Sequence, residues 1–331
     1  MRRRLPLASL GLLVGLTACV KDAPQTALEP QGPVARSIDR LSDPVFLVAG
    51  IVFVLVQGLI LVAVFRFRDK GQAEPEQIHG NTRLEIAWTL APALILFVIA
   101  VPTIKSIFDL SRKPADALAV TVTGHQFWWE YRYEDSGIVT ANELVMPVGR
   151  PVALTLKSVD VIHSFWVPAL AGKTDVIPGR VNNMSFTADH TGTYPGQCTE
   201  FCGLSHANMR NRAVALSPDE FDTWIEDQRK TPATPAEGTP AAEGLTVYAQ
   251  KGCGGCHTVA GVSEGKIGPN LTHFDSRETF AGSIFTNTPE NLRKWLADPL
   301  GVKPGNDMVI PGGPLNPDEV TKLIAYMETL K

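Results

Sequence analysis

The longest apolar runs of the 331-residue chain are at residues 45–65 and 86–104. Neither run contains a charged residue, and each approaches the ~20 residues that a helix needs to cross a bilayer. Buried core helices are the alternative, but two such runs within one short region disfavour it. We therefore predict two transmembrane helices, with Pro92 and Pro102 tolerated as kinks.

The loop between the two runs is basic, with Arg66, Arg68, Lys70 and Arg83. The positive-inside rule places such a loop in the cytoplasm, so both ends of the hairpin lie outside. We assign residues 19–114 to an N-terminal segment followed by this hairpin. The protein is expected to span the lipid bilayer of the plasma membrane twice, with both termini and the soluble domains on the extracytoplasmic side.

The N-terminus has the layout of an export signal. A basic start is followed by the apolar residues 5–16 and then by Leu16-Thr17-Ala18-Cys19, which resembles the bacterial lipoprotein box. We predict a lipoprotein signal peptide over residues 1–18 and a lipid anchor on Cys19, which an exported N-terminus permits. An ordinary signal peptide and a short first membrane helix are the alternatives.

Beyond the hairpin, the pattern changes to short alternating runs such as residues 119–123 and 151–156, separated by Gly and Pro. This pattern predicts a β-sandwich over residues 115–229. Residues 230–243 are rich in Pro, Ala, Thr and Glu, as in a semi-flexible linker. Apolar residues then recur at helical spacing, which predicts a small helical domain over residues 244–331. A core of that size is marginal unless it buries a cofactor.

Charge and cysteine content narrow the possible functions. The formal charge of −4 comes without any basic cluster suited to a phosphate backbone, so nucleic-acid binding is excluded. The five cysteines do not form an even disulfide framework, and a chain of this length folds without one. Each cysteine instead belongs to a local pattern: Cys19 to the N-terminal box, and the other four to two separate motifs.

Cys253-Gly-Gly-Cys256-His257 is the C-x-x-C-H pattern of covalent haem c attachment. In this pattern the two thiols bond the haem, and the adjacent imidazole becomes an axial ligand of the iron. A disulfide beside an unrelated histidine is the alternative. The export signal and the preceding helical pattern favour the haem.

The second axial ligand is expected farther along this domain, where Met308, Met327 and His273 are available. Met308 lies in a loop containing Pro and Gly, as a chain that covers the far face of the haem should. Met327 falls on the apolar face of the last predicted helix, and His273 follows His257 closely; packing or surface roles suit both. We predict Met308, whose thioether would hold the reduction potential above that of a bis-histidine haem.

The central domain carries Cys198 and Cys202, four residues apart, followed by His206 and Met209, with His163 earlier in the chain. These soft thiolate, imidazole and thioether groups suit copper. They exceed the ligands of one blue-copper centre, so two copper ions sharing the two sulfurs fit better. A Cys198–Cys202 disulfide or a structural zinc site is the alternative, but neither accounts for His206 and Met209 in the same loop.

Several stretches resemble cytochrome c oxidase subunit II, and the resemblance covers nearly the whole chain. It rests on Glu85-x-x-Trp88-Thr-x-x-Pro92, on Gly124-His-Gln, on segments 164–168 and 173–180, and on Gly196-Gln-Cys198-x-Glu200-x-Cys202-Gly-x-x-His206-x-x-Met209. The added haem motif resembles the caa-type branch, in which a cytochrome c domain is fused to this subunit. The resemblance implies a multidomain fold: a transmembrane hairpin, a cupredoxin-like copper A domain and an all-α class I cytochrome c domain.

The resemblance also implies roles for individual residues. The ligands of a binuclear copper A centre would be His163, Cys198, Cys202, His206, Met209 and the backbone carbonyl of Glu200. The Glu200 carboxylate would point to a magnesium or manganese site shared with subunit I. Glu85 would lie at the cytoplasmic mouth of a proton path in that partner, or it would be a solvated residue at a helix start.

One position departs from the family pattern. The family usually follows Gly-His-Gln with the Trp that accepts electrons from soluble cytochrome c, but this chain has Phe127, followed by Trp128 and Trp129. Electrons would then reach copper from the tethered haem by another path, for which these three aromatic residues are candidates. Packing in a core is the alternative role.

The resemblance implies subunit II of a bacterial haem-copper oxidase, with no catalytic residue in this chain. Electrons would pass from an external donor, such as a cytochrome c or a quinol:cytochrome c reductase complex, to the haem, to copper and to subunit I, which reduces oxygen to water and translocates protons. Subunit III is a further expected partner. The linker would keep the haem domain at high effective concentration near copper. Subunit II of a copper-A nitric oxide reductase and a lipid-anchored copper storage or delivery protein are rival functions.

Overall fold

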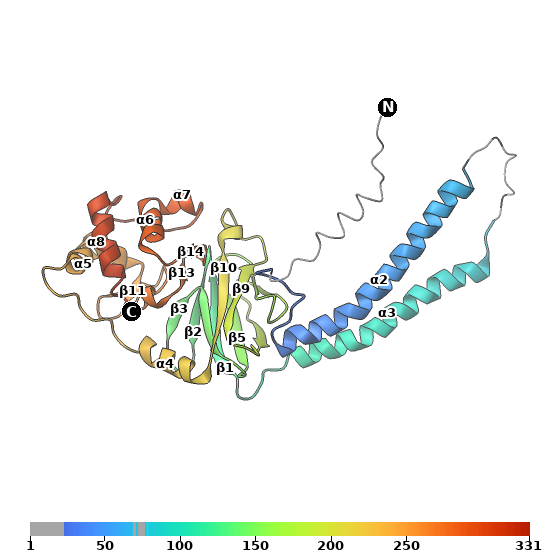
Figure 1. Cartoon of the computed structure of the whole chain (residues 1–331), viewed down its shortest axis with the longest axis horizontal. Coiled ribbons are helices and arrows are strands. Elements are labelled where there is room, and N and C mark those ends of the chain that lie inside the picture. The colour runs from blue at the N-terminus through green and yellow to red at the C-terminus, as the bar shows by residue number, and fades with distance from the viewer. Residues whose placement is uncertain (1–22, 69–70, 72–76, 78) are drawn as a thin grey trace, which may run out of the picture.

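The computed structural model describes residues 23–68, 71, 77 and 79–331, so the predicted signal peptide and Cys19 lie outside the described residues. The described chain forms three parts in a row: a long helical hairpin, a β-sandwich and a helical domain that carries the C-terminus (Figure 1). The sandwich stands between the other two parts. This arrangement confirms the predicted multidomain fold class.

Two of the described helices, α2 (Pro33–Arg66) and α3 (Thr82–Leu110), form the hairpin and contain the two predicted apolar runs. Helix α3 begins after Asn81, whose side-chain oxygen accepts hydrogen bonds from the backbone N–H groups of Arg83 and Leu84. None of the residues in the most apolar stretch of either helix is buried inside the chain. Apolar surface of this extent fits contact with lipid or with partner helices.

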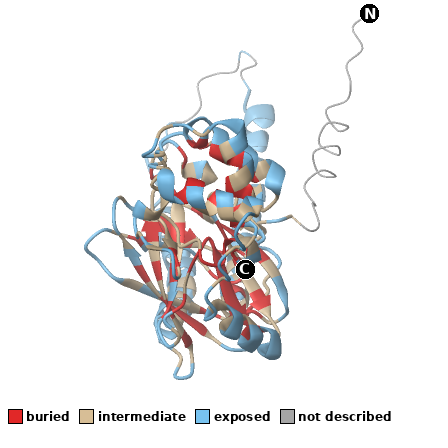
Figure 2. Cartoon of the chain, turned by 90° about the vertical axis from the view of Figure 1, so that its left-hand side faces the viewer, coloured by how far each residue is buried: buried red, intermediate tan, exposed pale blue. Residues whose placement is uncertain are grey.

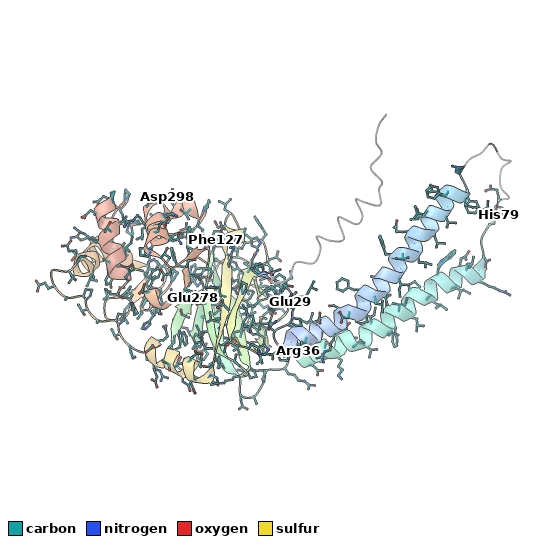
Figure 3. All side chains as sticks on the ribbon, viewed as in Figure 1. Glu29, Arg36, His79, Phe127, Glu278 and Asp298 are labelled. Atoms are coloured by element: carbon teal, nitrogen blue, oxygen red, sulfur yellow. The ribbon has the colours of Figure 1, made fainter. Side chains whose placement is uncertain are left out.

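Both helices are longer than the apolar runs, and the additional turns at their ends contain polar residues. The first turns of α2 pack against the sandwich, where the guanidinium of Arg36 forms an ion pair with Asp189 (Figure 3). Gly32 precedes the helix and touches the Thr187 carbonyl group so closely that a Cβ atom has no room. The start of α2 is thereby fastened to the sandwich.

The central domain is a two-sheet sandwich within residues 118–216, which are described throughout. One sheet has the strand order β3-β2-β1-β5-β8 and the other has β4-β10-β9-β6-β7. The strands are β1 (Leu118–His125), β2 (Trp128–Tyr133), β3 (Val139–Ala141), β4 (Glu143–Pro147), β5 (Val152–Ser158), β6 (His163–Trp166), β7 (Thr174–Val176), β8 (Asn182–Phe186), β9 (Gly192–Cys198) and β10 (Arg210–Leu216). The two alternating runs of the sequence lie in β1 and β5, which pair in parallel.

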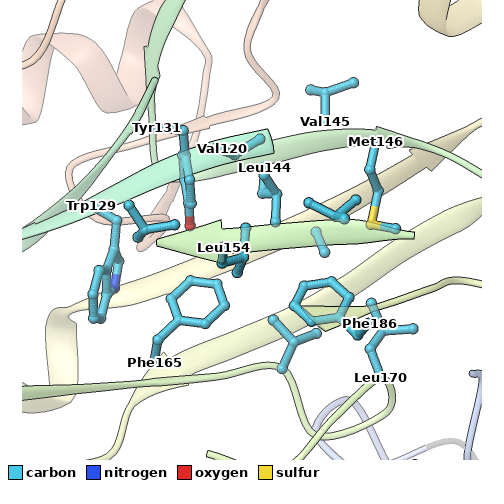
Figure 4. Packing of buried hydrophobic residues seen from close by; sticks show 14 of the residues in the cluster. Val120, Trp129, Tyr131, Leu144, Val145, Met146, Leu154, Phe165, Leu170 and Phe186 are labelled. Atoms are coloured by element: carbon cyan, nitrogen blue, oxygen red, sulfur yellow. The ribbon is translucent and has the colours of Figure 1, made fainter. Parts of the chain in front are cut away.

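The core of the sandwich lies between its two sheets (Figure 4). Residues along β1 alternate between buried and partly exposed, as expected for a strand with one face in a core. Tyr133 of β2 connects the sheets, because its buried hydroxyl group donates to the carbonyl oxygen of Val145 on β4 and accepts from the N–H of the same residue. The loops at the ends of the strands therefore have a rigid support.

Helix α4 (Pro218–Gln228) follows β10, and a capping box between Ser217 and Glu220 starts it. Residues 231–238 then form an irregular segment that leads to the last domain. Helix α5 (Pro240–Gln250) begins inside the predicted linker, because Thr239 caps its N-terminus and Pro240 suits a first helical turn. The irregular part of the linker is therefore shorter than composition suggests.

The C-terminal domain packs helices around a small core. Its elements are α5, η2 (Cys253–Gly255), β11 (Thr258–Val259), β12 (Ser263–Glu264), η3 (Phe274–Ser276), β13 (Thr279–Phe280), β14 (Phe285–Thr286), α6 (Pro289–Ala297), α7 (Pro299–Val302) and α8 (Pro317–Met327). The short hairpins β11–β12 and β13–β14 are additions to the expected all-α fold. Helices α5 and α8 cross at Gly244, where a Cβ atom would lie 2.8 Å from Cβ of Tyr326. Buried residues line the inward faces of the helices (Figure 2).

Candidate metal and haem sites

Sulfur and imidazole side chains gather at one end of the sandwich. His163 opens β6 and Cys198 ends β9, which are neighbouring strands of one sheet. Cys202 and His206 lie in the following loop, where η1 (His206–Asn208) makes a single turn, and Met209 directly precedes β10. The return of the chain from β9 to β10 therefore brings several donors close to the strand that supplies His163.

The donor atoms form one continuous cluster. The Sγ atoms of Cys198 and Cys202 lie 3.9 Å apart. Cys198 Sγ lies 3.9 Å from His163 Nδ1, whereas Cys202 Sγ lies 3.5 Å from His206 Nδ1 and 3.8 Å from Met209 Sδ. Both imidazoles and the thioether thus contact a two-sulfur centre, as two metal ions bridged by thiolates would need.

Glu200 joins this cluster through its backbone. Its carbonyl oxygen lies 3.4 Å from Cys198 Sγ. The residue itself is exposed, and so are its neighbours Phe201 and Leu204. The Glu200 carboxylate is therefore open to a partner molecule, as a shared metal site would require.

The geometry and chemistry of the cluster fit copper better than the two alternatives. Cys198 and Cys202 are both free, and their sulfurs are far beyond the ~2.0 Å of a disulfide. A structural zinc site uses four thiolate or imidazole donors and would leave Met209 without a role. Thiolate, imidazole and thioether together form the soft set that copper prefers.

The two thiols of the cluster differ in acidity. The hydrogen bond between the two cysteine sulfurs, with a further one with His163, lowers the pKa of Cys198 to about 4. The same contact between the sulfurs, together with burial, raises the pKa of Cys202 far above its usual range. One sulfur is therefore an anionic ligand at neutral pH, and a bound cation would displace the proton from the other.

Asp160 orients the imidazole of His163. Its Oδ1 atom lies 2.7 Å from His163 Nε2, and its Oδ2 atom accepts a hydrogen bond from the backbone N–H of Gln126. Burial lowers the pKa of His163, but the hydrogen bonds with Asp160 and Cys198 outweigh it, so the pKa is raised. A carboxylate on the outer nitrogen fixes a histidine ligand in this way in many metal sites. Nδ1 is then directed at the sulfur pair.

Residues of β1 and β2 fill the space around His163. Gly124 lies against the imidazole, where a Cβ atom would come within 2.8 Å of Cδ2. Trp129 is fully buried and packs edge-on to the same ring, with the ring centroids 5.8 Å apart. The ligand is thereby held in one position, which suits a site that must change geometry little during electron transfer.

A second candidate site is a cavity of about 570 Å³ at the C-x-x-C-H motif. Cys253, Cys256, His257 and Met308 all line it. Apolar side chains from α6 and α8 form much of the remaining wall, and the volume lies in the usual range for cofactor sites of roughly 300–1,000 Å³. The structure therefore brings together all four predicted haem residues.

The imidazole of His257 is held through one nitrogen. Nδ1 lies 2.8 Å from the carbonyl oxygen of Pro269, and Gly268 packs against the ring. Burial lowers the pKa of His257, so the imidazole is neutral at physiological pH. The neutral ring with Nδ1 engaged leaves Nε2 as the nitrogen for a metal bond.

The three candidates for the second axial ligand occupy different places. Met308 and Met327 both line the cavity. Met327 lies on α8 and belongs to the buried core, as its predicted packing role requires. His273 does not line the cavity; its Nε2 is 3.0 Å from the carbonyl oxygen of Gln228 at the end of α4. Met308 alone of the three combines a loop position with the cavity wall.

Arg277 gives the cavity a buried positive charge. One terminal nitrogen donates to the carbonyl oxygen of Asn270, while Nε has no hydrogen-bond partner in the described structure. Burial lowers the pKa of Arg277 to about 10, so the guanidinium remains charged at neutral pH. A buried cation with a free N–H group fits an anionic substituent such as a haem propionate. The cavity therefore suits both the apolar body and the charged edge of a haem.

The copper domain supplies one wall of the same cavity. His125, Phe127 and Trp128 line it, and the rings of His125 and Trp128 stack with centroids 4.1 Å apart. Trp129 points the other way, into the sandwich core beside His163 (Figure 4). Two consecutive residues of β2 thus contact the cavity on one side and His163 of the sulfur cluster on the other. Of the predicted aromatic candidates, Trp128 therefore lies at the cavity and Trp129 lies beside His163.

The remaining predicted site residue, Glu85, lies in the first turn of α3. It is exposed, and its carbonyl oxygen accepts a hydrogen bond from the hydroxyl group of Thr89. Both readings of the sequence, a proton path in a partner and a solvated helix start, agree with this position.

Sequence reasoning missed four polar residues beside the two sites: Asp160, Glu143, Arg277 and Lys303. Asp160 could have been found, because it lies three residues before a predicted histidine ligand. The other three look like ordinary surface charges in the sequence. Glu143 and Lys303 are buried where their hydrogen bonds join the two soluble domains, and Arg277 is buried at the wall of the cavity.

Family models match the hairpin, the sandwich and the C-terminal domain separately. Residues 25–106 match the transmembrane domain of cytochrome c oxidase subunit II, residues 136–215 its periplasmic domain, and residues 241–331 the cytochrome c family. Cytochrome c oxidase subunit 2 of Alkalihalophilus pseudofirmus is 40% identical over 99% of this chain and 97% of its own length. The same subunit of Bacillus sp. strain PS3 is 36% identical over 80% of this chain and 79% of its own.

A solved structure of the periplasmic domain of cytochrome oxidase subunit II from Bradyrhizobium japonicum is also similar. It is 34% identical, with 35% of this chain and 96% of that chain covered, at a TM-score of 0.34.

Fold and site together define a membrane-tethered electron-transfer protein with a copper domain and a c-type cytochrome domain. The full-length relatives identify it further: this chain belongs to the cytochrome c oxidase subunit II family, in the form that carries a fused cytochrome c domain. The resemblance read from the sequence is confirmed.

Proposed function

We propose that this chain receives electrons for a bacterial haem-copper cytochrome c oxidase and relays them from a covalent haem c to a binuclear copper A centre and on to subunit I. The observation that carries this proposal is that the copper domain forms one wall of the cavity at the C-x-x-C-H motif. Trp128 of β2 lines this cavity, and the following residue, Trp129, packs against His163. Two redox sites in such contact suit a relay. Oxygen reduction and proton translocation belong to subunit I.

The residues of each site have distinct tasks in this proposal. Cys198, Cys202, His163, His206, Met209 and the Glu200 carbonyl would hold the two copper ions. Cys253 and Cys256 would hold the haem covalently, and His257 and Met308 would be the ligands of its iron. When bound, these groups supply reversible one-electron chemistry.

The protein itself contributes rigidity and exclusion of water. Asp160 fixes His163, and Gly124 lets β1 press against the same ring, so the ligand keeps its position in both oxidation states. Trp128 on the cavity wall and Trp129 beside His163 are consecutive residues of β2, so the backbone of the strand joins the two aromatic side chains between the sites. Phe127 belongs to the docking contacts of the two domains and not to this path.

Several finer assignments are part of the proposal. Subunits I and III are the partners in the membrane, and the exposed Glu200 carboxylate helps to bind magnesium or manganese at the boundary with subunit I. Glu85 faces a proton path of that subunit. A cytochrome c or a quinol:cytochrome c reductase complex is the external donor, and an acyl chain on Cys19 adds a lipid anchor.

Metal and haem analysis of the purified membrane complex tests the proposal. Two copper ions and one haem c per chain should survive dialysis. Removal of residues 231–331 should leave the copper in place and lower oxidase turnover with an external reductant severalfold. A central site that contains zinc, or unchanged turnover in the truncated complex, would contradict the relay.

A further inference from the structure

The two soluble domains share an interface made by polar contacts between distant segments. Residues 127, 142–143 and 205–212 of the copper domain meet residues 278–283 and 303–305 of the cytochrome domain. The hydroxyl group of Ser205, a residue with no exposed surface, donates to the carbonyl oxygen of Pro304 at 2.6 Å. These contacts lie beside the loop that holds the copper ligands.

Glu143 forms one end of this interface. The residue is 6% exposed, and Oε1 accepts hydrogen bonds from the backbone N–H of Thr279 at 2.8 Å and from its hydroxyl group at 2.7 Å. Oε2 accepts from the N–H of Glu278, and Arg212 bridges this end by pairing with the Glu278 carboxylate at 2.7 Å. A buried carboxylate with this many donors from another domain is a specific contact.

Lys303 forms the other end. It is 3% exposed, and its Nζ atom donates to the carbonyl oxygen of Phe127 at 2.6 Å and to that of Ala281 at 2.8 Å. A buried ammonium group costs free energy unless its donors are satisfied, so its burial depends on the partner domain. Lys303 therefore holds Phe127 in place from the cytochrome side.

The loop between β13 and β14 fits tightly between these ends. Ala281, Gly282 and Ser283 all have positive φ angles, and the Gly282 carbonyl oxygen accepts a hydrogen bond from the N–H of Arg210. A Cβ atom at Gly282 would lie 2.7 Å from the Asn208 carbonyl oxygen and 2.9 Å from that of Phe127. Three successive residues in the left-handed region persist when surrounding contacts determine the backbone.

The interface also covers Phe127. The residue is 2% exposed, and its ring lies close to Gly203 of the copper loop and to Gly305 of the cytochrome domain. An external protein cannot reach this position while the cytochrome domain is docked. The surface beside copper is thus occupied by the chain itself.

We propose that Glu143 and Lys303 form an interdomain lock that holds the cytochrome domain in one docked position, so that the linker does not set the rate of electron transfer to copper. This inference rests on the proposed relay. It assigns both side chains as positioning residues, because neither belongs to the copper or haem ligands.

Linker length distinguishes a lock from a simple tether. The test inserts about twenty Gly and Ser residues between Ala233 and Thr234 in the intact oxidase, and measures the rate of electron transfer from haem c to copper after photochemical injection of an electron. A lock predicts a rate within about twofold of the unmodified chain. For a freely moving domain, effective concentration falls roughly as the −3/2 power of linker length, so extending the eight residues 231–238 to about 28 would slow transfer roughly sixfold.

The same insertion is then combined with Lys303→Met and Glu143→Gln. Without the lock, the insertion should slow transfer severalfold while the haem and copper spectra stay unchanged. The matched control carries Lys294→Met and Glu290→Gln, an exposed ion pair within α6, and should remain insensitive to the insertion.

Two results would overturn the lock. One is a severalfold slower rate from the insertion alone; this arm leaves the interface intact and does not depend on folding of the variants. The other is insensitivity of the Lys303/Glu143 variant to linker length. Failure of the relay itself looks different, because haem c in the unmodified oxidase would then not reduce copper at all.

Discussion

At the scale of single residues, His163 is held at both ring nitrogens. Nε2 meets the Asp160 carboxylate, and Nδ1 faces the Cys198 sulfur. The carboxylate decides which nitrogen is directed at the metal site and keeps the ring from turning. Asp160 therefore belongs to the site although it is not expected to touch copper.

Replacing Asp160 tests this positioning role. We expect Asp160→Asn to weaken copper retention by about 10–100-fold, the usual effect of losing an outer partner of a histidine ligand. Copper content after dialysis against a competing chelator measures the change. Asp135→Asn, at an exposed turn, is the control and should retain copper fully. Equal retention in both variants would show that His163 does not need its carboxylate.

The two cavity methionines give a second residue-scale prediction. Met308→His should lower the reduction potential of haem c, by a fraction of the ~0.8 V over which axial ligands tune haems, because a second imidazole replaces the thioether. Met327→Leu should leave the potential nearly unchanged, since Met327 packs in the core. Redox titration followed by haem absorbance separates them, and a large shift in Met327→Leu alone would reverse the assignment.

At the scale of elements, the crossing of α5 and α8 depends on Gly244. In an exposed helix, Gly→Ala gains up to about 1 kcal/mol. Here the added Cβ would meet Tyr326 Cβ at 2.8 Å as well as the Lys322 backbone, so we expect Gly244→Ala to destabilise the domain by about 1–3 kcal/mol.

Thermal unfolding of the cytochrome domain, followed by haem absorbance in the intact complex, measures this cost. For a domain of this size, 1 kcal/mol lowers the midpoint by roughly 4–8 °C. Thr246→Ala, at an exposed position of the same helix, is the control. A Gly244→Ala midpoint equal to or above that of the control would contradict the close crossing.

Elements with a clear local pattern could be predicted from the sequence. The alternation of residues 119–123 identified β1, and the apolar runs located α2 and α3. The polar first turns of α2 were missed, because they are helical through contacts with the sandwich, such as Arg36 with Asp189. The two-residue ladders of the cytochrome domain are too short to leave a periodic signal.

The site residues also divide into those with a local sequence signal and those without one. Cys198, Cys202, His206 and Met209 were found because one loop carries them at close spacing. The interdomain contacts could not be found, because the hydrogen bond between Glu143 and Thr279 joins residues 136 positions apart. The sequence suggested a haem domain that moves on its linker, whereas the structure places that domain in direct contact with copper-domain residues.

At the scale of the whole molecule, the buried Lys303 makes docking sensitive to pH. Burial lowers the pKa of Lys303 to about 7, whereas a lysine in an unfolded chain has a pKa near 10.4. Between these values the unfolded chain binds more protons than the folded one, so stability rises with pH over this window. Below about pH 7 both states carry the proton, and this contribution stays constant.

We expect the thermal midpoint of the cytochrome domain in the intact complex to rise from about pH 7 to about pH 9. In Lys303→Met the rise should be much smaller, because the titrating group is gone. The Lys294→Met variant, which changes an exposed lysine, should follow the unmodified protein. Parallel curves for unmodified protein and Lys303→Met would contradict the burial of this ammonium group.

We expect electrons to pass through this chain from its haem c to its copper pair. The decisive measurement is time-resolved absorbance of the intact oxidase after one electron is placed on haem c. Copper should be reduced with the same rate constant with which haem c is reoxidised, before the haems of subunit I change. If copper stays oxidised while haem c passes its electron elsewhere, the relay from haem c to copper is wrong.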